Sequence, residues 1–455
     1  MSFLDYKELA LKAIDNLYNL GDLSDVFIEI SSGESIKIED DKLEYSAFGM
    51  KKGMGLRVVK GEGNYYFHGL PDVKFLEEGI KALREALREE RPGRFVSRSL
   101  LTGGSSCLKR EPLQGMVELL WKLNEFFRKN ELVRQVVLSY RRSHQDVWVG
   151  NDEGGLVNDK RIYTFLTMGV VVEKDGRLET GYEVIGGTKG DEVLEERDPF
   201  EVAEKVLKRA LLTLSADPAP AGMMDVVIAG EAGGTMIHEA CGHGLEADIV
   251  RKESSVYAEK IGQEVASPLV TLVDDGTIPG LGGSISFDDE GVPAQRTVLI
   301  EKGVLKGYLT DRLSSKLMGL PLTGNGRREG FKDFPIPRMT NTFLEPGEHS
   351  FDEILSSVER GLLVLKMGGG EVNPTDGNFV FKVTEGYLIE KGKIGKPVRG
   401  ALLIGNGPQV LRNIKMLGRD LNFDVGLCGK DGQSVPVGDG QPTMLVGGLV
   451  IGGEG

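Results

Sequence analysis

The chain contains very little histidine and cysteine: its 455 residues include 5 His and 3 Cys. A small, odd number of cysteines in a long chain argues against a disulfide scaffold and is typical of the reducing cytoplasm. We therefore expect a cytoplasmic protein. Because histidine is so rare, two histidines that stand close together in the sequence also deserve a functional explanation.

Long apolar runs and an excess of basic charge are absent as well. No segment approaches the roughly 18 uninterrupted apolar residues of a membrane-spanning helix. The amino-terminal Met-Ser-Phe-Leu-Asp-Tyr-Lys-Glu lacks the basic start and apolar core of a signal peptide. The 55 basic and 69 acidic residues give a net charge of -14 with no basic stripe. We expect neither a nucleic acid nor a membrane as partner.

Glycine-rich segments are present but lack the context of a nucleotide site. The runs at 368–370, 405–407 and 452–453 are not followed by Lys-Ser or Lys-Thr, and they do not lie between a predicted strand and a helix. Tight turns and close backbone packing explain them better. We expect no nucleotide cofactor.

The length is sufficient for two domains with separate cores. Residues 215–222, Ser-Ala-Asp-Pro-Ala-Pro-Ala-Gly, have the composition of a linker. We predict an α/β domain at 1–217 and a β-rich domain at 222–455. The predicted fold class is α+β.

The amino-terminal half has a repeated order of elements. Helical spacing of apolar residues predicts helices near 5–20, 76–87, 113–127 and 199–212, the last with Asp198 as its N-cap and Pro199 in its first turn. Strand-like runs lie between them, at 26–30, 35–39, 55–59, 133–140, 147–150, 162–172 and 182–185. We predict a duplicated α/β arrangement with an antiparallel sheet and Asn-Asp or Asp-Gly hairpins.

The carboxy-terminal half alternates short β-rich runs with glycines. The runs are at 269–273, 297–300, 362–366, 379–383 and 401–404. One amphipathic helix is expected near 351–362. This pattern predicts a largely antiparallel sheet or barrel.

Residues 238–243, His-Glu-Ala-Cys-Gly-His, are the most informative segment. Two imidazoles can supply nitrogen ligands to Zn²⁺, and a carboxylate beside the metal can take a proton from water. The alternative is an amphipathic helix with two incidental histidines. The rarity of histidine and the nearby acids Glu246 and Asp248 favour a metal site. The other histidines have no partner pattern and are expected to be surface or packing residues: His68, His144 and His349.

The spacing of the two histidines demands a distorted helix. Residues i and i+5 of a regular α-helix point about 140° apart, whereas i and i+4 are only about 40° apart. His238 and His243 therefore converge only if a wide π-type turn, or a helix end, lies between them, and such turns occur mostly at functional sites. Gly242 lies where the distortion costs least. The run 225–229 reads as a buried strand that leads through glycines into this helix.

A catalytic zinc usually has three protein ligands and an open position for water. Glu246 and Asp248 are candidates for the third ligand, or for an acceptor that orients an imidazole. Cys107, Cys241 and Cys428 are the other candidates, and Cys428 lies between glycines that allow close backbone approach to an ion. The residues alone leave these alternatives open.

Three motifs resemble those of one family. His-Glu-Ala-Cys-Gly-His-Gly-Leu-Glu-Ala-Asp at 238–248 is similar to the metal motif of the TldD subunit in the TldD/PmbA (TldD–TldE) metallopeptidases. Arg-Met-Thr-Asn-Thr at 338–342 and Cys-Gly-Lys-Asp-Gly-Gln-Ser-Val-Pro-Val at 428–437, followed by Gly-Gln-Pro-Thr at 440–443, resemble further motifs of that subunit. The resemblance extends over essentially the whole chain.

The resemblance implies that His238, His243 and Cys428 hold one zinc ion and that Glu239 is the general base. It implies an HExxxH-type zinc metallopeptidase that hydrolyses flexible or unfolded polypeptides. A homologous inactive TldE/PmbA-type subunit is the expected partner, and a homodimer is the alternative. Arg338 is our candidate for stabilising the oxyanion.

Two other functions are compatible with the same residues. One is a non-catalytic assembly or regulatory protein with a structural zinc, which would have four protein ligands and no task for Glu239. The other is a zinc amidase acting on a small molecule, which would have a small enclosed pocket.

Overall fold

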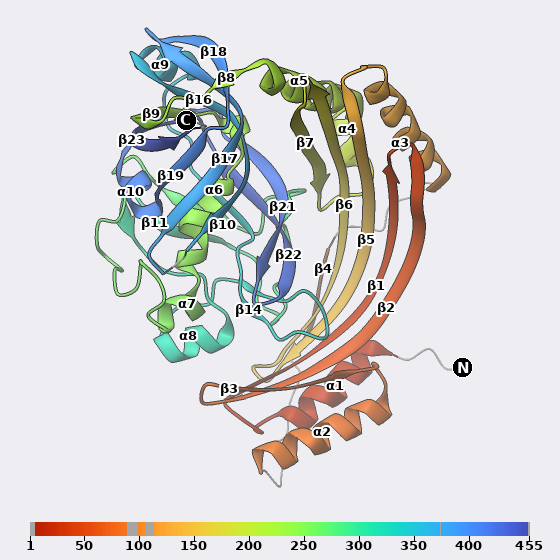
Figure 1. The fold of residues 1–455 in the computed structure, drawn as a ribbon. Coiled ribbons are helices and arrows are strands. Elements are labelled where there is room, and N and C mark those ends of the chain that lie inside the picture. Colours follow the sequence, from red (N-terminus) through yellow and green to blue (C-terminus); the bar gives the residue numbers. More distant parts are fainter. Residues whose placement is uncertain (1–4, 89–98, 105–112, 374, 454–455) are drawn as a thin grey trace.

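The computed structural model describes residues 5–88, 99–104, 113–373 and 375–453 (Figure 1). Its long amino-terminal strands form a curved sheet beside the carboxy-terminal half (Figure 1). Seven of the described strands make up this sheet, in the order β3-β2-β1-β5-β6, with β4 and β7 paired to different parts of β6. The pairings are antiparallel except between β4 and β6.

The order helix, three strands, helix occurs twice, which confirms the predicted duplication. The elements are α1 (Tyr6–Leu17), β1 (Leu23–Glu39), β2 (Lys42–Lys60), β3 (Gly63–Gly69), α2 (Val73–Leu87), β4 (Ser99–Gly104), α3 (Leu113–Arg128), β5 (Val133–Asn151), β6 (Gly155–Lys174), β7 (Arg177–Gly187), α4 (Glu192–Glu196) and α5 (Pro199–Ser215). Helix α5 begins at Pro199, and the Asp198 side chain accepts a hydrogen bond from the Phe200 amide, as expected of an N-cap.

Two pairs of predicted strands are single long strands. The runs at 26–30 and 35–39 both belong to β1, and those at 133–140 and 147–150 both belong to β5. The predicted breaks were wrong because β1 and β5 pair with each other continuously from Asp25 to Glu39, so polar residues in the middle of each strand still have ladder partners. Asp175 and Gly176 form the β6–β7 turn, both with positive φ, as predicted for an Asp-Gly hairpin.

Five described strands of the carboxy-terminal half close into a ring, which confirms the predicted barrel. The pairing runs from β16 through β9, β23, β19 and β17 back to β16. The strands associated with this ring are β8 (Asp217–Pro218), β9 (Gly222–Ile228), β16 (Arg360–Val372), β17 (Asn378–Glu390), β18 (Lys393–Arg399), β19 (Leu402–Asn406), β20 (Ile414–Leu417) and β23 (Met444–Gly452). Fully buried aliphatic side chains from several strands, such as Val226, Leu362 and Val446, fill its core.

A second carboxy-terminal sheet brings a distant strand to the metal motif. Six described strands follow the order β12-β11-β10-β15-β22-β21. They are β10 (Leu272–Asp275), β11 (Arg296–Glu301), β12 (Val304–Leu305), β15 (Asn341–Leu344), β21 (Asn422–Lys430) and β22 (Gln433–Gln441). A separate pair is formed by β13 (Gly326–Arg327) and β14 (Ile336–Pro337). The β21–β22 hairpin carries Cys428 and lies at the end of the sheet.

The helices of this half are short. They include α6 (Thr235–Ile237), α7 (Ala247–Arg251), α8 (Arg312–Met318), α9 (Phe351–Ser356) and α10 (Gly407–Arg412). The helix predicted at 351–362 ends at Ser356, because the residues from Arg360 onward pair with β9 and β17 as strand β16. The segment with linker composition takes part in the fold, since β8 pairs with β18. No helix in the described part of the chain is long and apolar enough to cross a membrane.

Buried ion pairs join the amino-terminal sheet to the segment that follows β10. Arg57 of β2 has no exposed surface, and its Nε lies 2.7 Å from Asp25 Oδ2 while its Nη2 pairs with Glu290. Arg328 Nη2 lies 3.1 Å from the other oxygen of Asp25. Buried charges are tolerated only when paired in this way. The contacts therefore hold the two halves in one relative placement.

Arg57→Met is expected to lower the free energy of unfolding by about 3–5 kcal/mol, because it leaves Asp25 and Glu290 buried with fewer counter-charges. Urea denaturation followed by circular dichroism measures the change. Lys12→Met, which removes a half-exposed pair with Glu77, is the control and should leave the midpoint nearly unchanged. Equal shifts for both variants would contradict a stabilising role for the buried pairs.

Candidate metal site

The helix that carries the two histidines is distorted as the spacing predicts. After β9 and a 3₁₀ turn at Gly230–Ala232, α6 leads into a π-helical turn at His238–Gly242 and a second 3₁₀ turn at His243–Leu245. A Cβ at Gly242 would lie 2.1 Å from the sulfur of buried Met339, so glycine allows the close packing beneath this turn. The predicted widening is confirmed.

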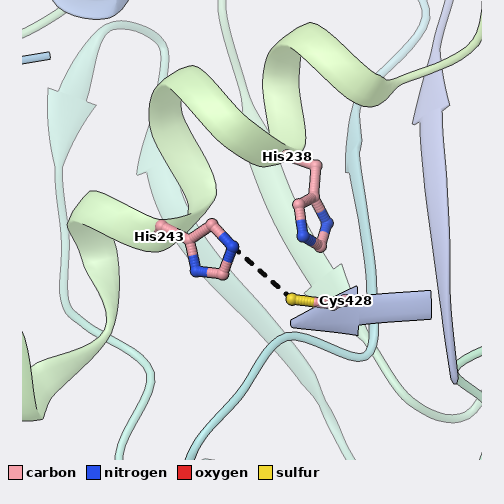
Figure 2. A group of neighbouring side chains, drawn as sticks. All are labelled: His238, His243 and Cys428. Atoms are coloured by element: carbon pink, nitrogen blue, oxygen red, sulfur yellow. Dashed lines mark hydrogen bonds between the residues drawn. The ribbon is translucent and has the colours of Figure 1, made fainter. Parts of the chain in front are cut away.

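The widened turn brings both imidazoles to Cys428. Figure 2 shows the two rings and the thiol facing one another, the rings from the distorted helix and the thiol from β21. Cys428 Sγ lies 3.5 Å from His243 Nε2, and the ring centroids of His238 and His243 are 5.0 Å apart. The ligand atoms of the three residues all lie within 4.8 Å of one another, and all three side chains are buried.

This geometry and donor set fit zinc. Tetrahedral Zn²⁺ binds sulfur at about 2.3 Å and nitrogen at about 2.0–2.1 Å, which places the two donors about 3.6 Å apart. The sulfur–nitrogen distance of 3.5 Å matches that value. Two imidazoles and a thiolate are also ligands that zinc prefers.

Buried carboxylates orient both imidazoles. His238 Nδ1 lies 2.6 Å from Asp439 Oδ1, and His243 Nδ1 lies 2.9 Å from Glu246 Oε2. With each Nδ1 engaged by a carboxylate, each Nε2 remains for a metal. Glu246 is thus an acceptor that orients an imidazole, one of the two roles expected for it.

Sequence reasoning missed Asp439, although it lies between two of the quoted motif segments. Strand β22, which carries it, runs parallel to β15 and antiparallel to β21. Asp439 could have been recognised in the sequence as an acidic residue beside a family motif, with small and apolar residues on either side of it.

The three side chains strongly influence one another's protonation. Burial opposes ionisation of Cys428, but the charge and hydrogen bond of His238, together with His243, outweigh it and lower the thiol pKa to about 5. Burial also opposes a charge on His243, yet Glu246 and Cys428 raise its pKa to about 9. Against the same opposition, Asp439 and Cys428 raise the pKa of His238 well above 6.5. These directions favour a Cys428 thiolate beside protonated imidazoles when no metal is bound.

Glu239 lies at the accessible side of this cluster. Its Oε2 is 3.8 Å from His243 Nε2, and a third of its side chain (33%) is exposed. A carboxylate in this position is close to the ligands yet remains open to solvent. The Asp248 carboxylate accepts a hydrogen bond from Lys430 at 2.7 Å.

Arg338, the candidate for stabilising the oxyanion, is enclosed within the fold. It has no exposed surface, and its guanidinium donates to the backbone carbonyls of Cys428 and Gln433. These contacts support the backbone of the β21–β22 hairpin, and the contact of Arg338 with an oxyanion stays a prediction. Arg327 and Arg328 are equally buried and donate to backbone carbonyls.

Of the other two candidate cysteines, Cys241 lies in the described part of the chain. Cys241 is buried on the same helical turn, where desolvation raises its pKa to about 12. Cys107 lies outside the described residues. Among the described residues, the group that could hold a metal consists of His238, His243 and Cys428 and includes no other histidine.

Sequence comparison identifies the class of this fold and site as a metallopeptidase. The PmbA/TldA metallopeptidase domain 1, central domain and C-terminal domain match residues 24–89, 108–214 and 221–453, respectively. The chain is 38% identical over 452 residues, 95% of its length and 93% of the relative's, to a metalloprotease TldD homolog of Haemophilus influenzae. The chain belongs to the PmbA/TldD metallopeptidase family.

A more distant relative is also named as a metalloprotease. A zinc metalloprotease TldD homolog of Saccharolobus solfataricus is 31% identical over 290 residues, 62% of this chain and 64% of that protein. Together with the ligand cluster, the names of these relatives support a metal cofactor.

Two solved structures share the fold at 20% identity. A protein from Bacteroides thetaiotaomicron, described as a candidate modulator of DNA gyrase, superimposes with a TM-score of 0.77 and complete coverage of both chains. TldE from Thermococcus kodakarensis gives a TM-score of 0.73, covering 96% of this chain and 99% of its own.

Cys428→Ser is expected to weaken zinc binding by more than the roughly 10–100-fold that loss of an outer partner costs, because it removes one of the three candidate ligands. Elemental analysis of the purified protein measures the metal content. Cys241→Ala, which changes a buried thiol outside the cluster, should retain its zinc. Unaltered zinc in Cys428→Ser would remove this residue from the ligands.

Zinc affinity is expected to increase with pH up to about 9. A ligand nitrogen must be free of its proton, and the pKa of His243 near 9 means that zinc displaces a proton from it at neutral pH. The dissociation constant should fall about tenfold per pH unit for each displaced proton. Chelator competition between about pH 6 and 8 tests this, and a constant affinity over that range would contradict it.

Proposed function

We propose that this protein is an HExxxH-type zinc peptidase with one zinc ion per chain. The convergence of His238, His243 and Cys428, with Glu239 beside them, is the observation that supports this proposal most strongly. The cluster supplies three ligands from the described residues, and three is the number typical of catalytic rather than structural zinc.

Each residue has a distinct task in the proposed reaction. The two histidines and Cys428 hold the metal, and Asp439 and Glu246 fix the imidazole orientations. Zinc, when bound, polarises the peptide carbonyl and lowers the pKa of water. Glu239 accepts a proton from the attacking water and delivers it to the leaving amine nitrogen.

The proposed substrate is a flexible or unfolded polypeptide in extended conformation. Strand β21 is the last strand of its described sheet, so the edge away from β22 has no strand partner there. Next to Cys428, Gly426 and Gly429 have open space where a side chain would be. An extended peptide could pair along such an edge through its main chain and reach the ligand cluster. Recognition of main chain implies broad sequence preference.

The proposed partner is a homologous TldE/PmbA-type subunit, with a homodimer as the alternative and the cytoplasm as the compartment. The fold that this chain shares with TldE supports such a pairing. In this proposal residues 222–455 form the peptidase domain and residues 1–217 form a separate domain.

A structural zinc in an assembly protein is the competing proposal. It would require a fourth protein ligand and would leave Glu239 without a task. The Glu239 side chain is partly exposed, and its carboxylate lies 3.8 Å from His243 Nε2, which favours catalysis.

Glu239→Gln is expected to retain zinc and to lose cleavage by about 10²–10⁴-fold, because the amide cannot accept the proton from water. Cleavage of a reduced and alkylated polypeptide is measured by mass spectrometry, with the chain alone and with a TldE/PmbA-type subunit. Glu231→Gln, an exposed acid on the same segment, is the control. Cleavage at the wild-type rate by Glu239→Gln would refute the assigned base.

A further inference from the structure

Lys430 occupies an unusual position for a lysine. It is almost fully buried, with 8% of its side chain exposed, and it lies two residues after Cys428 on β21. Residues two apart on a strand project to the same face, so the thiol and the ammonium group lie on the same side of β21.

The ammonium group has three acceptors at close range. Nζ lies 2.7 Å from Asp248 Oδ1 and 3.0 Å from the Pro337 carbonyl oxygen, and it donates to both. It also lies 3.0 Å from Glu246 Oε2. An ammonium group has three donors, so these contacts fix its position.

The contact with Glu246 connects Lys430 to the metal ligands. The same oxygen, Oε2, accepts from His243 Nδ1 at 2.9 Å, while His243 Nε2 lies 3.5 Å from Cys428 Sγ. The contacts therefore form a closed circuit from Cys428 along the strand to Lys430, then through Glu246 and His243 back to Cys428.

We propose that Lys430 is a positioning residue that holds the Glu246 carboxylate in place. Through Glu246 it keeps the His243 ring directed at Cys428. This inference rests on the proposed metal role of the three ligands. Glu246 is fully buried, and its second oxygen, Oε1, has no hydrogen-bond partner among the described residues. Its orientation therefore depends on the contacts of Oε2 with His243 and Lys430.

The neighbouring Arg338 supports the same strand independently. It follows Pro337, whose carbonyl accepts from Lys430, and donates to the carbonyl of Cys428. Arg338 holds the backbone of the ligand strand, whereas Lys430 connects that strand to the carboxylate behind His243.

The test measures metal binding rather than catalysis. Lys430→Met is expected to raise the zinc dissociation constant roughly 10-fold or more, as loss of an outer partner does. In the cobalt-loaded protein it should also alter the thiolate-to-metal charge-transfer band, which reports on the Cys428 contact. Lys430→Arg, which keeps a cation beside Glu246, should recover most of the affinity. If Lys430→Met does not fold, Lys430→Gln replaces it in this test. The same increase in the zinc dissociation constant is then expected.

Lys366→Met is the matched control. Lys366 is also buried (11% exposed) and pairs with two carboxylates, Glu183 and Asp424, the second of which lies on β21. Lys366→Met removes a buried ammonium group and its ion pair with Asp424 of β21. It does not remove a contact of Glu246, the carboxylate that binds His243. It should leave the affinity and the cobalt spectrum unchanged.

A double-variant comparison establishes whether Lys430 acts through Glu246. In a Glu246→Gln background, Lys430→Met should have little further effect on zinc binding. The proposal would be overturned if Lys430→Met and Lys366→Met weakened zinc binding equally, or if Lys430→Met left zinc affinity unchanged. It would also be overturned if Lys430→Met caused its full loss of zinc affinity in the Glu246→Gln background. If the wild-type chain itself bound no zinc, the proposed metal function would fail, a result distinct from each of these.

Discussion

Two imidazole rings point their free nitrogens at one thiol because a buried carboxylate holds the opposite nitrogen of each ring. Asp439 and Glu246 are the two acceptors, and they come from different parts of the fold. Each hydrogen bond opposes rotation of its ring about the side-chain bonds, and the donor atoms lie within 4.8 Å of one another. The geometry of the candidate metal site therefore depends on these two hydrogen bonds, and the elements behind them provide the support.

That support is largely ionic and buried. The ion pair of Lys430 with Glu246 anchors β21, and the Arg57–Glu290 and Arg328–Asp25 ion pairs anchor the amino-terminal sheet against the other half of the chain. Such pairs add little net stability relative to apolar packing, but loss of one partner is costly because the other charge stays buried. They favour one arrangement of the segments over others. The buried cluster contrasts with the edge of β21 that has no strand partner in the described sheet, where our proposal places the substrate.

The sequence predicted most elements whose residues have strong local signals. Helices α1, α2, α3 and α5 were recognisable from apolar spacing, and the width of the turn between His238 and His243 followed from helix geometry. Predictions failed where pairing with distant segments overrode local preference. Polar residues within β1 and β5 looked like strand ends, and the carboxy-terminal part of the helix predicted at 351–362 belongs to a strand.

By itself, the sequence determined the ligand types, the need for a distorted helix and the family resemblance, because these depend on residue identity and short spacing. The tertiary structure decided the outer contacts. Asp439 lies 201 residues from His238, and Lys430 lies 184 residues from Glu246, so no local pattern connects them. It also decided the burial of Arg338, which was our oxyanion candidate because it lies in a family-like motif. Burial and long-range pairing arise only when the sheets close around the site, so they cannot be read from neighbours in the chain.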